Sequence, residues 1–298
     1  MRSCQLVPRL LSTRPVATRL FRSLSSFLLP FTLLPFALLL STAAPALAQA
    51  DDDEAALTPA EPAFRVINLP TTLRLPRYKS DFELTHRFNG NLRRGDLGDQ
   101  IGGLFGIDQG ATIGFEYRFA PIRHVEVAFY RENYDRTIQM YGKWDVIHQK
   151  QDRPVSVSPL LSIEGGNNFR ERYAPSLGVS ISRQIDDRAA VYAVPMWVHN
   201  VTPLAGQITG IKNNTFYVGL GGRLLIGSTV YISAEVSPRL AGLASNTAEY
   251  GFAIEKRVGA HVFQLNFSNS ELSTFAQTGA GGLPDSLFLG FNLTRKFF

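Results

Sequence analysis

The C-terminal stretch LFLGFNLTRKFF, residues 287–298, decides the fold of this chain. Apolar residues recur at every second position, so that Leu289, Phe291 and Leu293 share one face. Gly290 and Thr294 share the other face, and this period of two is expected of a strand between lipid and the lumen of a barrel. A strand of this kind that runs to an aromatic C-terminus is typical of bacterial outer-membrane barrels, and we expect the barrel-assembly machinery to recognise it.

The N-terminus indicates export. Residues 1–25 contain five arginines and no acid, residues 27–40 are almost wholly apolar, and residues 48–50 (AQA) form a cleavage site before Asp51. The apolar run is broken by Pro30 and Pro35 and is shorter than the roughly 20 residues of a membrane-spanning helix. We therefore predict a cleaved signal peptide over residues 1–50 and a location in the outer membrane.

Removal of residues 1–50 leaves a chain without net charge. The full sequence has 30 basic and 25 acidic residues, and five of the basic ones lie in the signal peptide, which leaves 25 of each. A neutral domain gives no case for binding nucleic acid, which needs a basic face. The single cysteine, Cys4, leaves with the signal peptide, so the mature chain has neither disulfides nor thiolate metal sites.

Strand-length segments with turn signals between them fill the chain from Ser80 onward. Alternation of apolar and polar residues predicts strands near 80–88, 112–119, 124–132, 137–148, 155–165, 173–183, 189–199, 214–225, 229–237, 249–257, 260–268 and 286–298. Short and long connections mostly alternate, which places both chain ends on the short-turn side and requires an even number of strands. We predict an all-β fold, an antiparallel transmembrane β-barrel of about twelve strands over residues 80–298.

Residues 51–79 precede this barrel. The segment 51–62 is acidic and poor in apolar residues, so we expect a flexible periplasmic leader. The segment 64–77, interrupted by Pro70 and Pro76, plugs or lines the barrel mouth or lies extended against it, and the sequence leaves these alternatives open.

A soluble sandwich or lipocalin-like barrel would show the same alternation with its apolar face inward. Two features favour lipid outside. The polar face carries small residues such as Ser158, Ser162 and Ser180, as a lumen needs, and the apolar face carries aromatic residues near strand ends, such as Phe88 and Trp144.

Five segments carry a resemblance to a known family: THRF (85–88), LFGIDQGATIGFEY (104–117), GGR (221–223), HVFQLNFSNS (261–270) and GFNLTRKF (290–297). They resemble a bacterial β-barrel family named only as domain of unknown function 5777, and HVFQLNFSNS and GFNLTRKF are the more specific of them. The resemblance covers nearly all of the mature chain. It implies a signal-bearing outer-membrane barrel and no established activity, substrate or catalytic residue.

The sequence indicates no enzyme, catalytic residue, cofactor or metal site. Its histidines, His86, His124, His148, His199 and His261, are dispersed and lie outside any nucleophile or H-E-x-x-H motif. His199 beside Asn200 is the one pair that a rim-located, lipid-modifying enzyme would use, a remote alternative. The glycines of 219–222 lack the lysine and helix of a phosphate cradle, and we expect a tight bend between barrel strands there.

Charged residues of the polar phase are the candidate lumen-lining set: Glu83, Arg87, Glu116, Arg118, Glu126, Lys143, Asp145, Glu235, Glu255 and Arg257. Opposite charges that pair across the interior would close it into a solid barrel, whereas charges on opposed walls around water would form a narrow, weakly selective pore.

Two hypotheses follow. The first is a passive channel or transport-related barrel for small solutes. The second is a non-conducting structural or interaction barrel whose long loops, 89–109, 200–214 and 268–285, contact external partners. Outer-membrane lipid is the expected surrounding in both.

Overall fold

The computed structural model describes residues 60–150, 152–201, 214–242 and 247–298. The expected signal peptide and the first part of the expected leader lie outside these residues. Within the described part of the chain no helix is long and apolar enough to cross a membrane.

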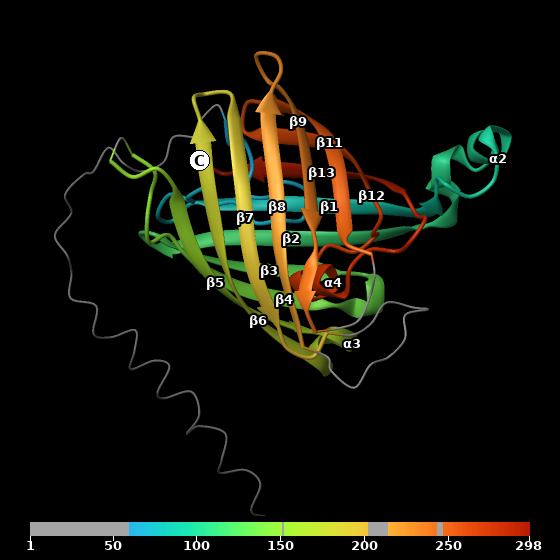
Figure 1. Ribbon diagram of the computed structural model, residues 1–298, viewed down its shortest axis with the longest axis horizontal. Coiled ribbons are helices and arrows are strands. Elements are labelled where there is room, and N and C mark those ends of the chain that lie inside the picture. Colours follow the sequence, from blue (N-terminus) through green and yellow to red (C-terminus); the bar gives the residue numbers. More distant parts are fainter. Residues whose placement is uncertain (1–59, 151, 202–213, 243–246) are drawn as a thin grey trace, which may run out of the picture. The chain divides into compact units, whose positions relative to one another are not determined.

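Antiparallel strands form the wall of the molecule (Figure 1). They are β1 (Ser80–Asn91), β2 (Ala111–Ile122), β3 (Val125–Glu132), β4 (Ile138–Trp144), β5 (Ser156–Gly165), β6 (Glu171–Ile185), β7 (Ala189–Val198), β8 (Thr215–Leu225), β9 (Val230–Ser237), β10 (Arg239–Ala241), β11 (Glu249–Val258), β12 (His261–Ser268) and β13 (Phe288–Lys296). Only Pro238 separates β9 from β10, and both pair with β8, so they form one strand of the wall.

The wall closes on itself. Each strand pairs with its neighbours along the chain, and the first strand pairs with the last, from Asp81 opposite Lys296 to Arg87 opposite Gly290. The result is a closed, antiparallel, twelve-stranded barrel, which confirms the predicted fold. Closure leaves no strand edge unpaired, as a sheet in lipid requires.

Alternation of side chains gives the wall two different faces. Along β1 the residues Asp81, Glu83 and Arg87 are buried on the inside, and in β13 the inward residues include Asn292 and Lys296. The outside carries large apolar side chains that are exposed in the isolated chain, including Phe115, Tyr117, Leu161, Trp197, Ile254 and Phe263. The apolar face is therefore the outer one, as a lipid-facing barrel needs.

Two of the strands differ from the predicted pattern. The strand expected over 137–148 ends at Trp144. Beyond it only isolated pairings remain: the Asp145 amide donates to the carbonyl of His124 at 2.8 Å, and Ile147 forms a bridge with Val157. Pro195 lies within β7, and the ladder between β6 and β7 is interrupted opposite it, since proline has no N–H to donate.

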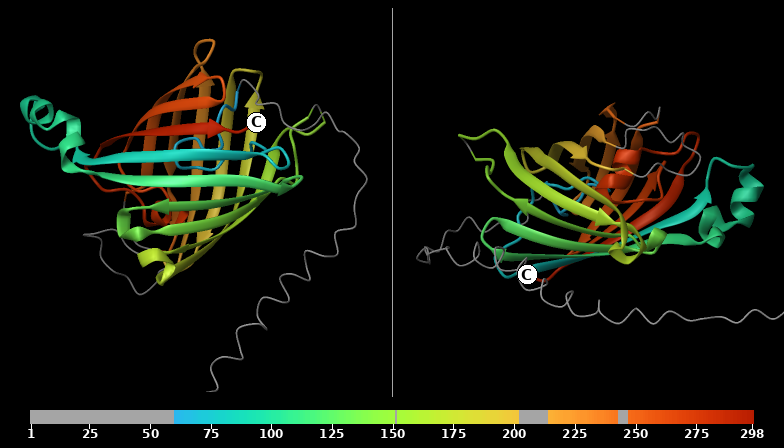
Figure 2. Two further views of the ribbon diagram at one scale, coloured as in Figure 1. Left: turned by 180° about the vertical axis from the view of Figure 1, so that it is seen from behind. Right: turned by 90° about the horizontal axis from the view of Figure 1, so that it is seen from below.

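Helical turns occupy four of the connections. They are α2 (Leu97–Gly102) with the 3₁₀ turn η1 (Leu104–Gln109), η2 (Tyr134–Arg136), α3 (Gly166–Phe169) and α4 (Phe275–Ala280). Two segments lie within the ring of strands: residues 60–76, drawn in blue, and α4, drawn in red (Figure 2). In contrast, α2 lies at the far end of β1 and β2. We call the rim that carries the start of β1 and the end of β13 the terminal rim, and the opposite one the loop rim.

Candidate functional site

The lumen is filled by residues 60–76, which we call the N-terminal plug. The plug reverses direction inside the barrel, where the amide of Val66 donates to the carbonyl of Leu69 at 2.9 Å and that of Thr71 donates to Phe64 at 2.9 Å. Every residue from Ala60 to Leu73 is buried. The sequence left open whether residues 64–77 plug or line the barrel mouth or lie extended against it, and residues 64–73 are buried inside the barrel. Residues 60–62, expected as part of the flexible leader, are buried with them.

Glu235 on β9 holds the turn of the plug. Its carboxylate accepts hydrogen bonds from the consecutive amides of Ile67 (2.9 Å), Asn68 (2.9 Å) and Leu69 (3.1 Å). Successive backbone amides that point to one anion form a strong, specific contact, because the acceptor is charged. The turn residues themselves carry no charge, so the barrel wall supplies the anion.

A cluster of ionic side chains holds the middle of the plug. Arg65 pairs with Glu116 on β2 and lies 4.0 Å from Glu83 on β1. Arg118 contacts three carboxylates, Asp81 at 2.5 Å, Glu83 at 2.6 Å and Glu116 at 2.6 Å. These side chains are 3% exposed or less, so each charge depends on its partners rather than on water.

The remaining plug contacts spread around the wall. Lys143 on β4 donates to the carbonyls of Thr71 (3.1 Å) and Leu73 (3.0 Å), and the Thr72 hydroxyl lies 2.5 Å from that of Ser182 on β6. Arg74 pairs with Asp145 beside the terminal rim. Strands from every side of the barrel thus contact the same seventeen-residue segment.

Gly219 on β8 makes room for the plug. A Cβ atom at this position would lie 2.3 Å from Leu69 Cδ2, and the chain runs straight through 219–222 within β8. The expected tight bend at 219–222 is therefore wrong. The glycine provides the space into which an apolar plug residue packs.

A second segment, residues 269–283, folds into the barrel from the loop rim; we call it the loop plug. It contains α4, all six residues of which are buried, and the capping box of Thr274 and Gln277 starts this helix. The Phe275 amide donates to Gln139 Oε1 at 2.9 Å, and the Gln277 side chain donates to Glu132. The expectation that the loop 268–285 faces external partners is wrong for these residues, because they lie inside.

The candidate lumen-lining residues all lie on the inner phase of their strands. Nine are buried, and all nine contact the plug directly or through one neighbour: Glu83, Arg87, Glu116, Arg118, Glu126, Lys143, Asp145, Glu235 and Glu255. Glu126 pairs with Lys143 at 3.3 Å, and Glu255 pairs with Arg223 at 3.1 Å. Arg257 is half-buried near the terminal rim, away from the others.

Sequence reasoning missed several inward charges. On the wall they are Asp81, Glu132, Arg223, Glu249 and Lys296, and in the plug they are Arg65 and Arg74. Asp81 and Lys296 share the polar phase of strands that the alternation had already identified, so a complete count of that phase would have found them. The plug arginines have no such signal, because their carboxylate partners are at least 18 positions away in the chain.

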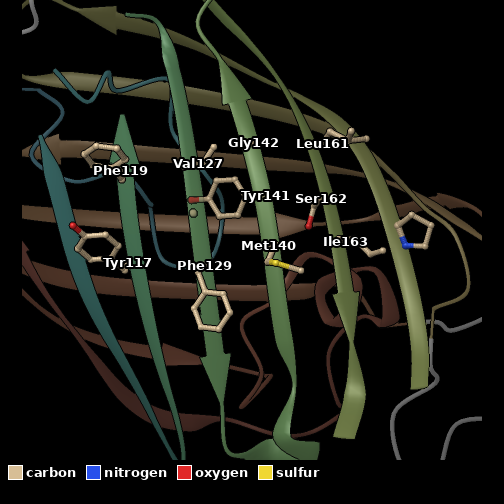
Figure 3. Close-up of a pocket in the computed structure, with 12 residues that line it drawn as sticks. Tyr117, Phe119, Val127, Phe129, Met140, Tyr141, Gly142, Leu161, Ser162 and Ile163 are labelled. Atoms are coloured by element: carbon tan, nitrogen blue, oxygen red, sulfur yellow. The ribbon is translucent and has the colours of Figure 1, made fainter. Parts of the chain in front are cut away.

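A groove with a volume of about 910 Å³ lies on the outer face of β2–β6. Figure 3 shows Tyr117, Phe129 and Met140 around it, and Gly142 leaves its floor open. Its lining is almost wholly apolar. The groove therefore belongs to the lipid-facing surface rather than to a path for polar solutes.

The histidines and acids assemble no further site. His199 is exposed, its Nδ1 lies 2.6 Å from Asn214 Oδ1, and its ring stacks on Trp197. Within the residues that the structure describes, no group of three or more metal-ligating side chains comes together.

The comparisons with known proteins agree with this architecture. A family model described as membrane bound beta barrel domain (DUF5777) matches residues 62–297. The chain belongs to this family. The resemblance noted in the sequence is thereby confirmed, and the family domain takes in nearly all of the N-terminal plug as well as the barrel. None of the curated proteins matches the chain.

Solved structures of porins and channels are similar in fold. The NanC porin is 9% identical with a TM-score of 0.47, and the match covers 74% of this chain and 100% of that one. The KdgM porin is 7% identical with a TM-score of 0.47 and coverages of 74% and 99%. An outer membrane channel from Pseudomonas putida F1 is 10% identical with a TM-score of 0.47 and coverages of 75% and 97%. Likeness at this level says nothing about the solute.

Proposed function

We propose that this membrane barrel is an outer-membrane channel for small polar solutes that its own N-terminal plug closes at rest. Residues 1–50 serve as the signal peptide, the terminal rim faces the periplasm, and the last strand engages the barrel-assembly machinery. The observation that carries the proposal is the chemistry of the lumen wall. Its charged groups bind main-chain and side-chain groups of a segment that is continuous with the wall at one end only, near Tyr78.

The strand number supports a removable filling. A barrel of eight strands is filled by the side chains of its own wall, whereas wider barrels hold water or a plug. With twelve strands, the space taken by residues 60–76 would be a water-filled, polar cavity once the plug left, and it would become a passage if the loop plug moved as well. The plug is attached through hydrogen bonds and ion pairs, which water and dissolved ions can replace, and through apolar side chains such as Leu69 and Phe64.

A non-conducting interaction barrel is the second candidate. Two observations favour it: both plugs fill the lumen, and the α2–η1 connection exposes Leu97, Ile101 and Leu104 by 69%, 56% and 53%. Apolar side chains that far beyond the strands suit contact with a partner.

Single-channel conductance of the mature chain, residues 51–298, in planar bilayers tests the proposal. The substitutions Arg65→Ala and Asn68→Ala remove plug side chains and leave the wall intact, so we expect discrete conductance steps more often than in the unaltered protein. Adding Thr72→Cys and Ser182→Cys places two thiols where the hydroxyls lie 2.5 Å apart, and oxidation should lock the plug and silence the channel. Reduction should restore the steps, since the mature chain has no other cysteine.

A cross-link within the wall provides the control. Ser162→Cys with Ser176→Cys joins β5 to β6 at paired positions without involving the plug, so oxidation should leave conductance unchanged. A folded, loosened barrel without conductance would support the interaction barrel instead. If the conductance stayed the same after oxidation of the cysteines introduced at positions 72 and 182, the plug would not be the gate.

A further inference from the structure

Arg65 of the plug sits in a chamber built by other parts of the chain. Its guanidinium pairs with Glu116, approaches Glu83 within 4.0 Å, and donates through Nη1 to the carbonyl of Ser273 at 3.1 Å. The ring of Tyr130 lies beneath it, with 5.5 Å from Arg65 Cζ to the ring centroid. Carboxylates, a carbonyl oxygen and an aromatic face are the groups that recognise a planar cation with several donors and no acceptor.

The wall alone leaves this chamber negatively charged. Three carboxylates, those of Asp81, Glu83 and Glu116, surround Arg118 of the wall, and Arg65 supplies a further positive charge. Lys296 of β13, which lies opposite Asp81 in the sheet, is the other wall cation nearby. Among the described residues, Asp81 Oδ1 is buried without a hydrogen-bond partner even with Arg65 in place. Departure of the plug would leave these groups with a net charge of −1 in a largely desolvated place, which favours a replacement cation.

The second plug arginine follows the same pattern. Arg74 neutralises Asp145 of the wall, so the plug brings a positive charge to each of two separate wall carboxylate sites. The plug also contains one buried acid, Glu61, so it brings one net positive charge to the lumen. An emptied lumen would therefore be more acidic than the closed one.

We propose that the Arg65 chamber is a binding site for solutes that carry a guanidinium or ammonium group, and that Arg65 occupies it in place of the solute when the barrel is closed. The proposal rests on the proposed channel function. It names the class of solute, organic cations, and the side chains that recognise them: Glu116, Glu83 and Tyr130.

Binding of agmatine to the detergent-solubilised mature chain tests the site without any conductance measurement. Isothermal titration calorimetry compares the unaltered protein with Arg65→Ala and with Arg65→Met, which keeps an apolar stem of similar length. We expect both variants to bind agmatine at least tenfold more tightly than the unaltered protein, because the competing side chain is gone. Glu116→Gln added to either variant should weaken binding at least tenfold.

Two controls separate the chamber from general attraction. Glu126→Gln removes an inward carboxylate that faces Lys143 instead, so agmatine affinity should stay within twofold. Butanoate, an anion of similar length, should not bind any variant. Equal affinity in the unaltered and Arg65 variants, or affinity that Glu116→Gln leaves unchanged, would overturn the proposal even if the barrel conducts ions. Tight agmatine binding by a barrel that never conducts would uphold the chamber and overturn the channel.

Discussion

Glu235 illustrates how one residue of the wall can determine the state of the plug. Its carboxylate accepts three plug amides, and hydrogen bonds to a charged group contribute about 1.5–3 kcal/mol. Glu235→Gln keeps the shape and removes the charge. We expect the free energy of local plug opening to fall by about 1.5–3 kcal/mol, which speeds amide exchange at residues 67–69 roughly tenfold to a hundredfold. Hydrogen exchange followed by mass spectrometry measures this.

The matched control is Glu171→Gln at the loop rim. Glu171 is exposed and pairs with Arg172 at 3.2 Å, so its change should leave exchange in the plug as it was. Unchanged exchange at 67–69 in Glu235→Gln would mean that the apolar contacts of Val66 and Leu69, not the carboxylate, hold the turn.

At the scale of elements, α4 anchors the loop plug through one aromatic side chain. Phe275 is 2% exposed and packs on Tyr141 with 5.3 Å between ring centroids. Replacing a buried phenylalanine by alanine costs about 3–5 kcal/mol, and residues 269–283 can leave the barrel without breaking a strand pair. We therefore expect Phe275→Ala to make this segment sensitive to protease while the barrel stays folded.

Limited proteolysis of the reconstituted protein checks this expectation, with heat-dependent gel mobility as the measure of barrel integrity. Phe263→Ala is the matched control, because Phe263 is 49% exposed on the lipid face and touches neither plug. Protease resistance equal to that of the unaltered chain would show that polar contacts such as Gln277 with Glu132 suffice to hold α4.

The strands could be predicted from the sequence and the plugs could not. Alternation such as that of β13 records the two environments of a strand locally, which is why all twelve segments end within four residues of the predicted bounds. The largest differences are at β4, which ends at Trp144, and at β9, which continues through β10 to Ala241. Residues 269–283 look like a polar surface loop because their wall partners, Gln139 for the Phe275 amide and Glu132 for the Gln277 side chain, are more than 130 positions away in the chain.

At the scale of the whole molecule, the candidate lumen residues contact not only one another but also the N-terminal plug. The wall strands place acidic and basic residues at the alternate positions that face the lumen, and the sequence predicted this placement. A segment that precedes the barrel and has no strand pattern adds two arginines, Arg65 and Arg74, and one acid, Glu61, to this interior. Charge counts made on a barrel wall alone therefore leave out part of the charge that faces the lumen.

The orientation of the wall gives the last prediction. Leu161 lies midway along β5, 65% exposed on the outer face. If lipid covers that face, Leu161→Arg should lower the free energy of unfolding from bilayers by about 2–4 kcal/mol, the cost of a cation near the midplane of a barrel. Ile226→Arg, in the short turn after β8 and 56% exposed, should cost at most about 1 kcal/mol, because it lies near the membrane surface. Urea titration in vesicles distinguishes the two, and equal, small effects would mean that water rather than lipid covers the barrel.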